Sequence, residues 1–374
     1  MNRKRILILL AVVLVLAALV YLQFREWRSF DWDTFLRVTG EISKTNVVFA
    51  IGIIYLTYVL RAVRWKIFLR PVCHARLRKM VPPQFIGFTG LALLGRPGEL
   101  IRPYLIAKKE NLTFSSQVAV WAVERIFDIG AFAVLMAIDV FFFAPDFNLD
   151  PAITRELRAG GAVLLALVAG MGLGAWAIRR NSEGVANWLE RRLSKLSKKL
   201  GKSVCHKIRA FGAGLNTIHD TSSFVQLVGV SLAIWLLIAL AYREVLHAYP
   251  VVGGAHAARI PLHEVSVPHV LLLMGASMIG SLLQLPAVGG GSQLATISVM
   301  SSPAIFAVPS EQAVSAGMML WLVTFVACVP VGLVFAHREH LSLRKLTQES
   351  SMEEQEAETD ESSVPPRVVP RAES

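Results

Sequence analysis

The chain has little charge and few cysteines for its length. Only 17% of its 374 residues are charged, whereas 54% are hydrophobic, and the mean hydropathy is +0.52. This composition excludes an ordinary soluble enzyme and is typical of a polytopic membrane protein. The three cysteines, Cys73, Cys205 and Cys328, lie far apart without a CxxC pair. They therefore indicate neither a disulfide framework nor a zinc site.

Motifs of nucleotide and metal chemistry are also missing. The glycine clusters lack the Lys-Ser/Thr of a phosphate-binding loop, and His263-Glu264 lacks the second histidine of a zinc protease. Asp31-Trp32-Asp33 is a DxD motif in a predicted outer loop, but the outer loops are too short to hold an acceptor domain. We therefore expect no catalytic residues, no metal, no cofactor and no ATP-driven mechanism.

Positive charges outnumber negative ones, giving a net charge of +11. The basic residues are distributed over the loops between apolar runs, which is how membrane proteins encode their orientation. This distribution argues against nucleic acid as a partner and favours anionic lipid head groups. The sequence does not specify an oligomeric state.

Long apolar runs predict an all-α polytopic membrane protein with about six full transmembrane helices. Two further runs, 82–107 and 268–308, are interrupted by Gly95-Arg96-Pro97-Gly98 and by a Pro/Gly-rich stretch over 285–291. Only about a dozen apolar residues precede the first break, which is too few to span a bilayer. Both runs therefore predict re-entrant helical hairpins. The six predicted spans are 6–24, 46–60, 115–143, 160–178, 224–241 and 314–336.

The loop charges predict how these segments are oriented. If both interrupted runs are hairpins, the loops on one side hold 27 Lys and Arg residues and those on the other side hold 8. The positive-inside rule then places both termini in the cytoplasm, in a cell (inner) membrane. The first hairpin would enter from the cytoplasm and the second from outside. Opposed hairpins are typical of transporters built from inverted repeats, although this chain has no visible self-similarity.

The chain divides into a membrane domain and a tail. Residues 1–346 form the predicted transmembrane domain, and the acidic, Pro-containing tail 347–374 is expected to be disordered. Within the domain, the basic segment 182–220 carries Val, Trp and Leu at helical spacing. This pattern predicts an amphipathic helix lying on the cytoplasmic membrane surface.

The first break contains the candidate residues Gly98, Glu99 and Arg102. If Gly98 opens a helix, its free backbone N–H groups and positive dipole end suit a phosphate. Arg102 could bind a phosphodiester as a fork, while Glu99 receives a head-group amine or holds the arginine. The alternative is that Glu99 and Arg102 only neutralise one another.

The third span carries Glu124, Arg125 and Asp128 in its interior. Charges at this depth need partners, and Arg102, Arg61 and Arg64 are the available ones. We predict a charge network between this span and the first hairpin, which would either bind the substrate or act as an internal staple. Arg61 and Arg64 could instead extend to the membrane surface or contact a lipid phosphate.

The second break contains the candidate residues Gln284, Pro286, Gly289 and Gly290. They predict an uncharged, flexible turn whose backbone could approach a ligand. A purely structural re-entrant turn would need the same residues.

The ordered set GE-x-x-R at 98–102, ER-x-x-D at 124–128 and the later Pro/Gly-rich break resembles the lysylphosphatidylglycerol synthetase transmembrane-region family, also called the flippase-like family. The resemblance covers roughly residues 6–340. It implies a lipid translocase without an aminoacyl-transferase domain. The lipid would be an anionic or aminoacylated phospholipid, or a polyprenyl or hopanoid lipid.

We therefore expect an integral-membrane flippase rather than an enzyme. The head group would enter a polar cavity between the two hairpins, lined by Glu99, Arg102 and the charges of the third span. The alternatives are a membrane transferase that acts on a lipid-linked substrate and a structural membrane partner recruited through the basic segment.

Overall fold

The computed structural model describes residues 30–143, 151–193, 221–251, 258–281 and 290–339, together with Leu341 and Met352. Within these ranges the chain is helical and contains no β-strand. Its α-helices are α2 (Trp32–Gly40), α3 (Lys44–Leu69), α4 (Leu77–Leu94), α5 (Ile101–Glu110), α6 (Phe114–Ile138), α7 (Pro151–Arg180), α8 (Ser182–Leu193), α10 (Thr221–His247), α11 (Val267–Ser281), α12 (Gly290–Ser301), α13 (Ser310–Trp321) and α14 (Cys328–Arg338).

Five helical stretches are long and apolar enough to cross a membrane, which confirms an all-α polytopic membrane protein. Two of them contain π-helical segments, Asp139–Phe143 after α6 and Leu322–Val326 between α13 and α14. Of the six predicted spans, only 6–24 lies outside the described residues. The stretches are Lys44–Leu69, Phe114–Phe143, Thr154–Gly174, Ser222–His247 and Ser310–Arg338.

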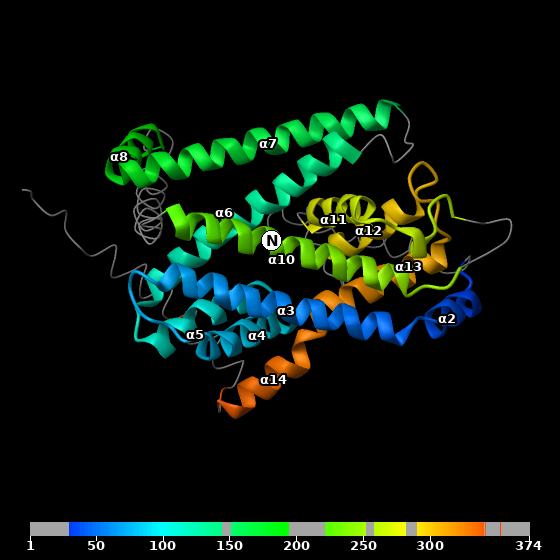
Figure 1. The fold of residues 1–374 in the computed structure, drawn as a ribbon, viewed down its shortest axis with the longest axis horizontal. Helices are drawn as coiled ribbons and strands as arrows, with labels where there is room; N and C mark the ends of the chain where they lie inside the picture. The colour runs from blue at the N-terminus through cyan, green and yellow to red at the C-terminus, as the bar shows by residue number, and fades with distance from the viewer. Residues whose placement is uncertain are drawn as a thin grey trace, which may run out of the picture.

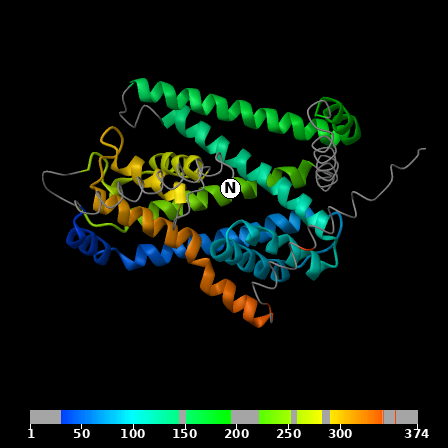
Figure 2. The same ribbon diagram turned by 180° about the vertical axis from the view of Figure 1, so that it is seen from behind.

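Both interrupted runs form helical hairpins, as predicted. Helix α4 packs against α5 and against the 3-10 segment η1 (Arg96–Leu100), and α11 packs against α12. The long helices α3 and α10 lie side by side through the middle of the molecule (Figure 1). The hairpins α4–α5 and α11–α12 lie toward opposite ends of these two helices, in both views (Figures 1 and 2). The membrane face from which each hairpin enters stays a prediction.

Glycines allow the two arms of each hairpin to approach closely. A Cβ atom at Gly98 would collide with the backbone of Gly90 across the first hairpin. A Cβ atom at Gly280 would collide with the carbonyl oxygen of Gly291 across the second. The absence of a side chain at these positions therefore sets the width of both hairpins.

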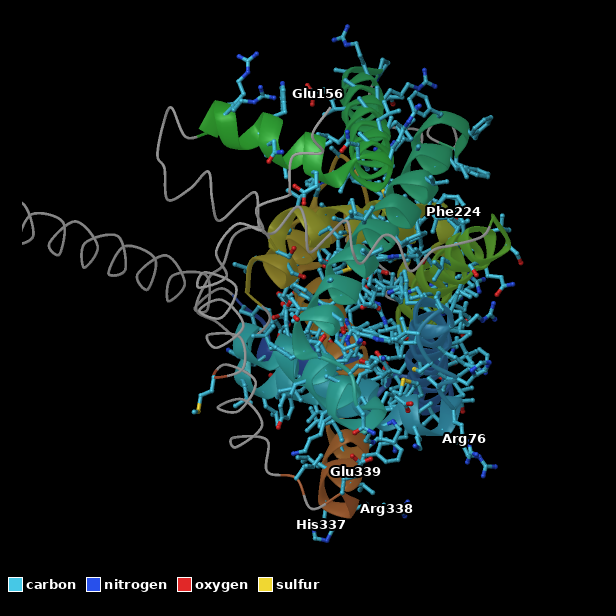
Figure 3. All side chains as sticks on the ribbon, turned by 90° about the vertical axis from the view of Figure 1, so that its left-hand side faces the viewer. Arg76, Glu156, Phe224, His337, Arg338 and Glu339 are labelled. Carbon is cyan, nitrogen blue, oxygen red and sulfur yellow. The ribbon has the colours of Figure 1, made fainter. Side chains whose placement is uncertain are left out.

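The last membrane-crossing stretch contacts both hairpins. Helix α13 packs against α12, α14 packs against α4, and the π-helical segment between them packs against α3 and α4. The C-terminal half of this stretch leaves the bundle at one end, where Figure 3 labels His337 and Arg338. A single helical stretch therefore connects the two hairpins.

Two peripheral helices complete the described structure. Asp31 caps α2, because its Oδ1 atom accepts hydrogen bonds from the backbone N–H groups of Asp33 and Thr34. Helix α8 is the described part of the predicted amphipathic segment and packs against α7. The rest of that segment, 194–220, lies outside the described residues, as does the tail 347–374 apart from Met352.

Candidate functional site

Two arginines of α3 face two acids of α6 in the membrane-crossing bundle. Because one helical turn separates the members of each pair, both pairs project from one face of their helix. Arg64 is fully buried, and its Nη2 atom donates to Oε1 of Glu124 at 2.5 Å. Its Nη1 atom donates to Oδ1 of Asp128 at 2.7 Å and to the Ser231 hydroxyl at 2.9 Å. Arg64 therefore forms the centre of the network.

Arg102 connects the first hairpin to this centre. Its Nη2 atom donates to Oε2 of Glu124 at 2.5 Å, and its Nη1 atom donates to the Gln84 amide oxygen at 3.1 Å. The guanidinium also stacks over Trp65, with 4.7 Å between Cζ and the ring centroid. Glu124 thus binds an arginine from α3 and an arginine from α5. The predicted network between the third span and the first hairpin is present.

Arg61 and Arg125 complete the network through longer contacts. Nη1 of Arg61 lies 3.5 Å from Oδ2 of Asp128, and Nη2 of Arg125 lies 3.8 Å from the same oxygen. Arg61 and Arg64 are both buried, so neither side chain extends to the membrane surface. Arg125 is more open, with 42% of its side chain exposed. Four guanidinium groups share two carboxylates, which leaves an excess of positive charge.

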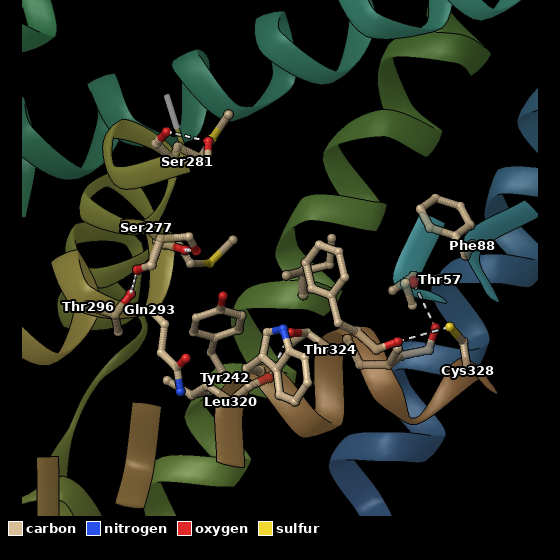
Figure 4. Close-up of a pocket in the computed structure, with 18 of the residues that line it drawn as sticks. Thr57, Phe88, Tyr242, Ser277, Ser281, Gln293, Thr296, Leu320, Thr324 and Cys328 are labelled. Atoms are coloured by element: carbon tan, nitrogen blue, oxygen red, sulfur yellow. Dashed lines mark hydrogen bonds between the residues drawn. The ribbon is translucent and has the colours of Figure 1, made fainter. Parts of the chain in front are cut away.

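A cavity of about 780 Å³ is lined by α4 of the first hairpin and by α11 and α12 of the second, together with α3, α10 and the last membrane-crossing stretch. This volume is within the roughly 300–1,000 Å³ typical of small-molecule pockets. Most of the lining is apolar, but hydroxyl and amide side chains from the second hairpin face it from one side (Figure 4). These polar residues are Ser277, Ser281, Ser292, Gln293 and Thr296.

Arg61 is the network residue that lines this cavity. Phe88 separates the cavity from Arg102: its ring centroid lies 5.1 Å from Cζ of Arg61 and 5.3 Å from Cζ of Arg102. On the far side of Phe88, a small cavity of about 40 Å³ is lined by Glu99, Arg102 and Arg125. The structure therefore brings the predicted charges together but distributes them over a buried network and two neighbouring cavities.

The glycine-rich breaks differ from simple helix starts. Gly98 lies inside the 3-10 segment η1, and the α-helix begins at Ile101, so Arg102 lies in its first turn while Glu99 precedes it. Gly290 begins α12 with a positive φ of 54°. The other predicted residues of the second break, Gln284, Pro286 and Gly289, lie outside the described residues.

Several polar residues near the network were not predicted. Gln84 and Ser231 each bind a network arginine, and the Trp235 ring lines the large cavity with a buried Nε1 atom that has no acceptor. A lone glutamine or serine in an apolar run is a weak signal, although it could have marked both positions. Asp139 is also buried on the stretch that continues α6, and neither of its carboxylate oxygens has a partner.

Comparison with known proteins agrees with this architecture. Residues 7–332 match the family described as the lysylphosphatidylglycerol synthase TM region. No curated protein and no solved structure matches the chain. The match spans the bundle, both hairpins and all residues of the charge network.

Proposed function

Because the chain belongs to the lysylphosphatidylglycerol synthase TM region family, we propose that it is a flippase that moves a lipid with a polar head group between membrane leaflets. The cavity between the two opposed hairpins carries this proposal. It combines apolar walls, which suit a lipid, with a charged group at one side and hydroxyl groups at the other. Inverted-repeat transporters bind their substrates at the interface between the repeats, near the bilayer midplane.

In this proposal the head group enters the cavity while the acyl chains remain in the bilayer. Arg61 contacts the head group directly, because it is the network residue in the cavity wall. Arg64 and Arg102 act behind it by connecting α3 and the first hairpin to Glu124. Movement of one hairpin relative to the other would then open the cavity alternately to each leaflet.

The test is reconstitution of the full chain into liposomes that contain fluorescently labelled phospholipids. Dithionite quenches only the outer leaflet, so a flippase increases the quenched fraction above that of protein-free vesicles. Thr57→Phe would fill the cavity next to Arg61 and should slow translocation. Val48→Phe on the exposed face of α3 is the matched control, and we expect it to have no effect.

Quenching equal to that of protein-free vesicles would contradict the proposal. Mass spectrometry of the recovered lipids separates it from the alternative of a membrane transferase. We expect lipids of unchanged mass after incubation with activated donors, and a new product mass would favour the transferase.

The proposed orientation places the basic loops and both termini in the cytoplasm of a cell inner membrane. Lys108 at the end of α5 should then be cytoplasmic. A Lys108→Cys variant should resist a membrane-impermeant maleimide added to intact cells and react after permeabilisation. Labelling in intact cells would contradict this orientation.

A further inference from the structure

The charges around the large cavity point to one class of head group. Within the part of the chain that the structure describes, Arg61 is the charged residue in the lining, and no carboxylate faces the cavity. Residues 282–289, which connect α11 to α12, contain no acidic residue either. An ammonium group in this cavity would find no counterion, and desolvating an unpaired cation costs several kcal/mol.

The acids of the network are already occupied by arginines. Both oxygens of Glu124 accept from Arg64 and Arg102, and the two oxygens of Asp128 contact Arg64 and Arg61. Since four arginines share these two acids, the network attracts an anion and repels a cation. Arg61 is the point where this excess positive charge meets the cavity.

Arg61 is able to bind an anion in this cavity. It lines the cavity and is 8% exposed, and its contact with Oδ2 of Asp128 is 3.5 Å long. The shorter ion pairs of the network belong to Arg64 and Arg102. Phosphate oxygens are strong acceptors for a guanidinium group.

The opposite side of the cavity offers neutral hydrogen-bonding groups. Ser277 and Ser292 are hydrogen-bonded to each other at 2.6 Å across the second hairpin, and Gln293 lies one residue further along α12. Figure 4 shows Ser277, Gln293 and Thr296 across the cavity from Thr57 and Phe88. Hydroxyl and amide groups suit the hydroxyls of a head group and require no charge on it.

We propose that the substrate is a lipid whose head group is a phosphate ester bearing hydroxyls and no amine, bound by Arg61 through its phosphate. This inference rests on the proposed flippase function. It predicts that the cavity binds anionic, hydroxylated head groups. It also predicts that aminoacylated and ethanolamine head groups bind poorly.

The test compares three labelled probes in phosphatidylcholine vesicles that contain the full chain: phosphatidylglycerol, phosphatidylethanolamine and lysyl-phosphatidylglycerol. We expect phosphatidylglycerol to move at least tenfold faster than either amine-bearing probe. Equal or faster movement of an amine-bearing probe would overturn the inference and leave the flippase function intact. If no probe moves, the proposed function fails and the inference fails with it.

Two substitutions test the assigned cation. Arg61→Gln should slow phosphatidylglycerol transport about tenfold or more, because a hydrogen bond to a charged group contributes about 1.5–3 kcal/mol. Arg61→Lys keeps a positive charge at the cavity and should retain more transport than Arg61→Gln. Unchanged transport in the folded Arg61→Gln protein would overturn the site.

A lipid and a free phosphate ester share the same head-group chemistry. Soluble glycerol 3-phosphate added to the vesicles should slow phosphatidylglycerol transport only weakly, since it lacks the acyl chains that contact the apolar walls. If glycerol 3-phosphate raises the melting temperature of the purified protein while phosphatidylglycerol neither binds nor moves, the ligand is a free phosphate ester. That result would overturn the lipid assignment.

Discussion

The two hairpins share a shape but are held in place by different forces. The first is connected to the long helices by buried charge, because Arg102 on α5 donates to Glu124 on α6. The second contains no charged residue within α11 or α12 and is held by apolar packing, a glycine contact and a serine pair. Charge-assisted hydrogen bonds are about twice as strong as neutral ones. The first hairpin is therefore the fixed element of the pair and the second is the easier one to displace.

Glu124→Gln tests the charged side of this comparison and should have the largest effect. The substitution removes the shared counterion of Arg64 and Arg102 and leaves buried guanidinium groups uncompensated. Breaking a buried ion pair from one side costs about 3–5 kcal/mol, so the melting temperature in detergent should fall sharply. Glu339→Gln is the matched control, since Glu339 pairs with Lys109 and its side chain is 26% exposed. We expect that partly exposed pair to contribute at most about 1 kcal/mol. Equal losses in the two variants would show that burial does not strengthen the network.

Gly98→Ala and Gly280→Ala test the close approach that the hairpins have in common. Each added methyl group would collide with backbone atoms of the opposite arm, and overpacking of this kind costs about 1–3 kcal/mol. We expect both variants to melt earlier, with the larger loss in the first hairpin, where separating the arms also strains the Arg102 contacts. Gly130→Ala on α6 is the control, because no atom lies within 4 Å of its added Cβ. A larger loss for Gly280→Ala would reverse the assignment of the fixed hairpin.

Ser277→Ala tests the neutral side and should have the smallest effect. It removes one hydrogen bond between α11 and α12, and a neutral hydrogen bond contributes about 0.5–1.5 kcal/mol. Ser281→Ala is the control, since that hydroxyl donates to the Met278 carbonyl within its own helix. Both can be measured by thermal unfolding in detergent. If Ser277→Ala destabilises the protein as much as Glu124→Gln, the second hairpin is not the weaker one.

Much of this architecture could be predicted from hydropathy and charge alone. Glycine and proline interrupt two apolar runs, and ionisable residues inside an apolar run need partners, so the hairpins and the pairing of Glu124 with Arg102 follow from general rules. What hydropathy does not determine is how each helix is rotated about its axis. Rotation decides that Arg61 faces the large cavity while Arg64, one turn away, is enclosed by α6 and α10.

The neutral members of the site were harder to identify for a related reason. A serine such as Ser231 or a tryptophan such as Trp235 occurs in many membrane helices without any function. Only the position of the partner helix makes Ser231 an acceptor for Arg64 or leaves the Trp235 N–H group without one. Such residues acquire their roles through tertiary packing, which local sequence patterns do not contain.

The π-helical segment Leu322–Val326 lies between α13 and α14 in the last membrane-crossing stretch. A π turn inserts one extra residue, which rotates the following helix by about 100° relative to the preceding one. Helix α13 can therefore present one face to the second hairpin while α14 presents another to the first. Trp321, Thr324 and Phe325 line the cavity at this joint. The proposed flippase function requires the two hairpins to move relative to one another, which would change the angle between α13 and α14. The π-helical segment is the part of this stretch where the regular α-helical hydrogen bonding is already interrupted, so we expect the bend to occur there.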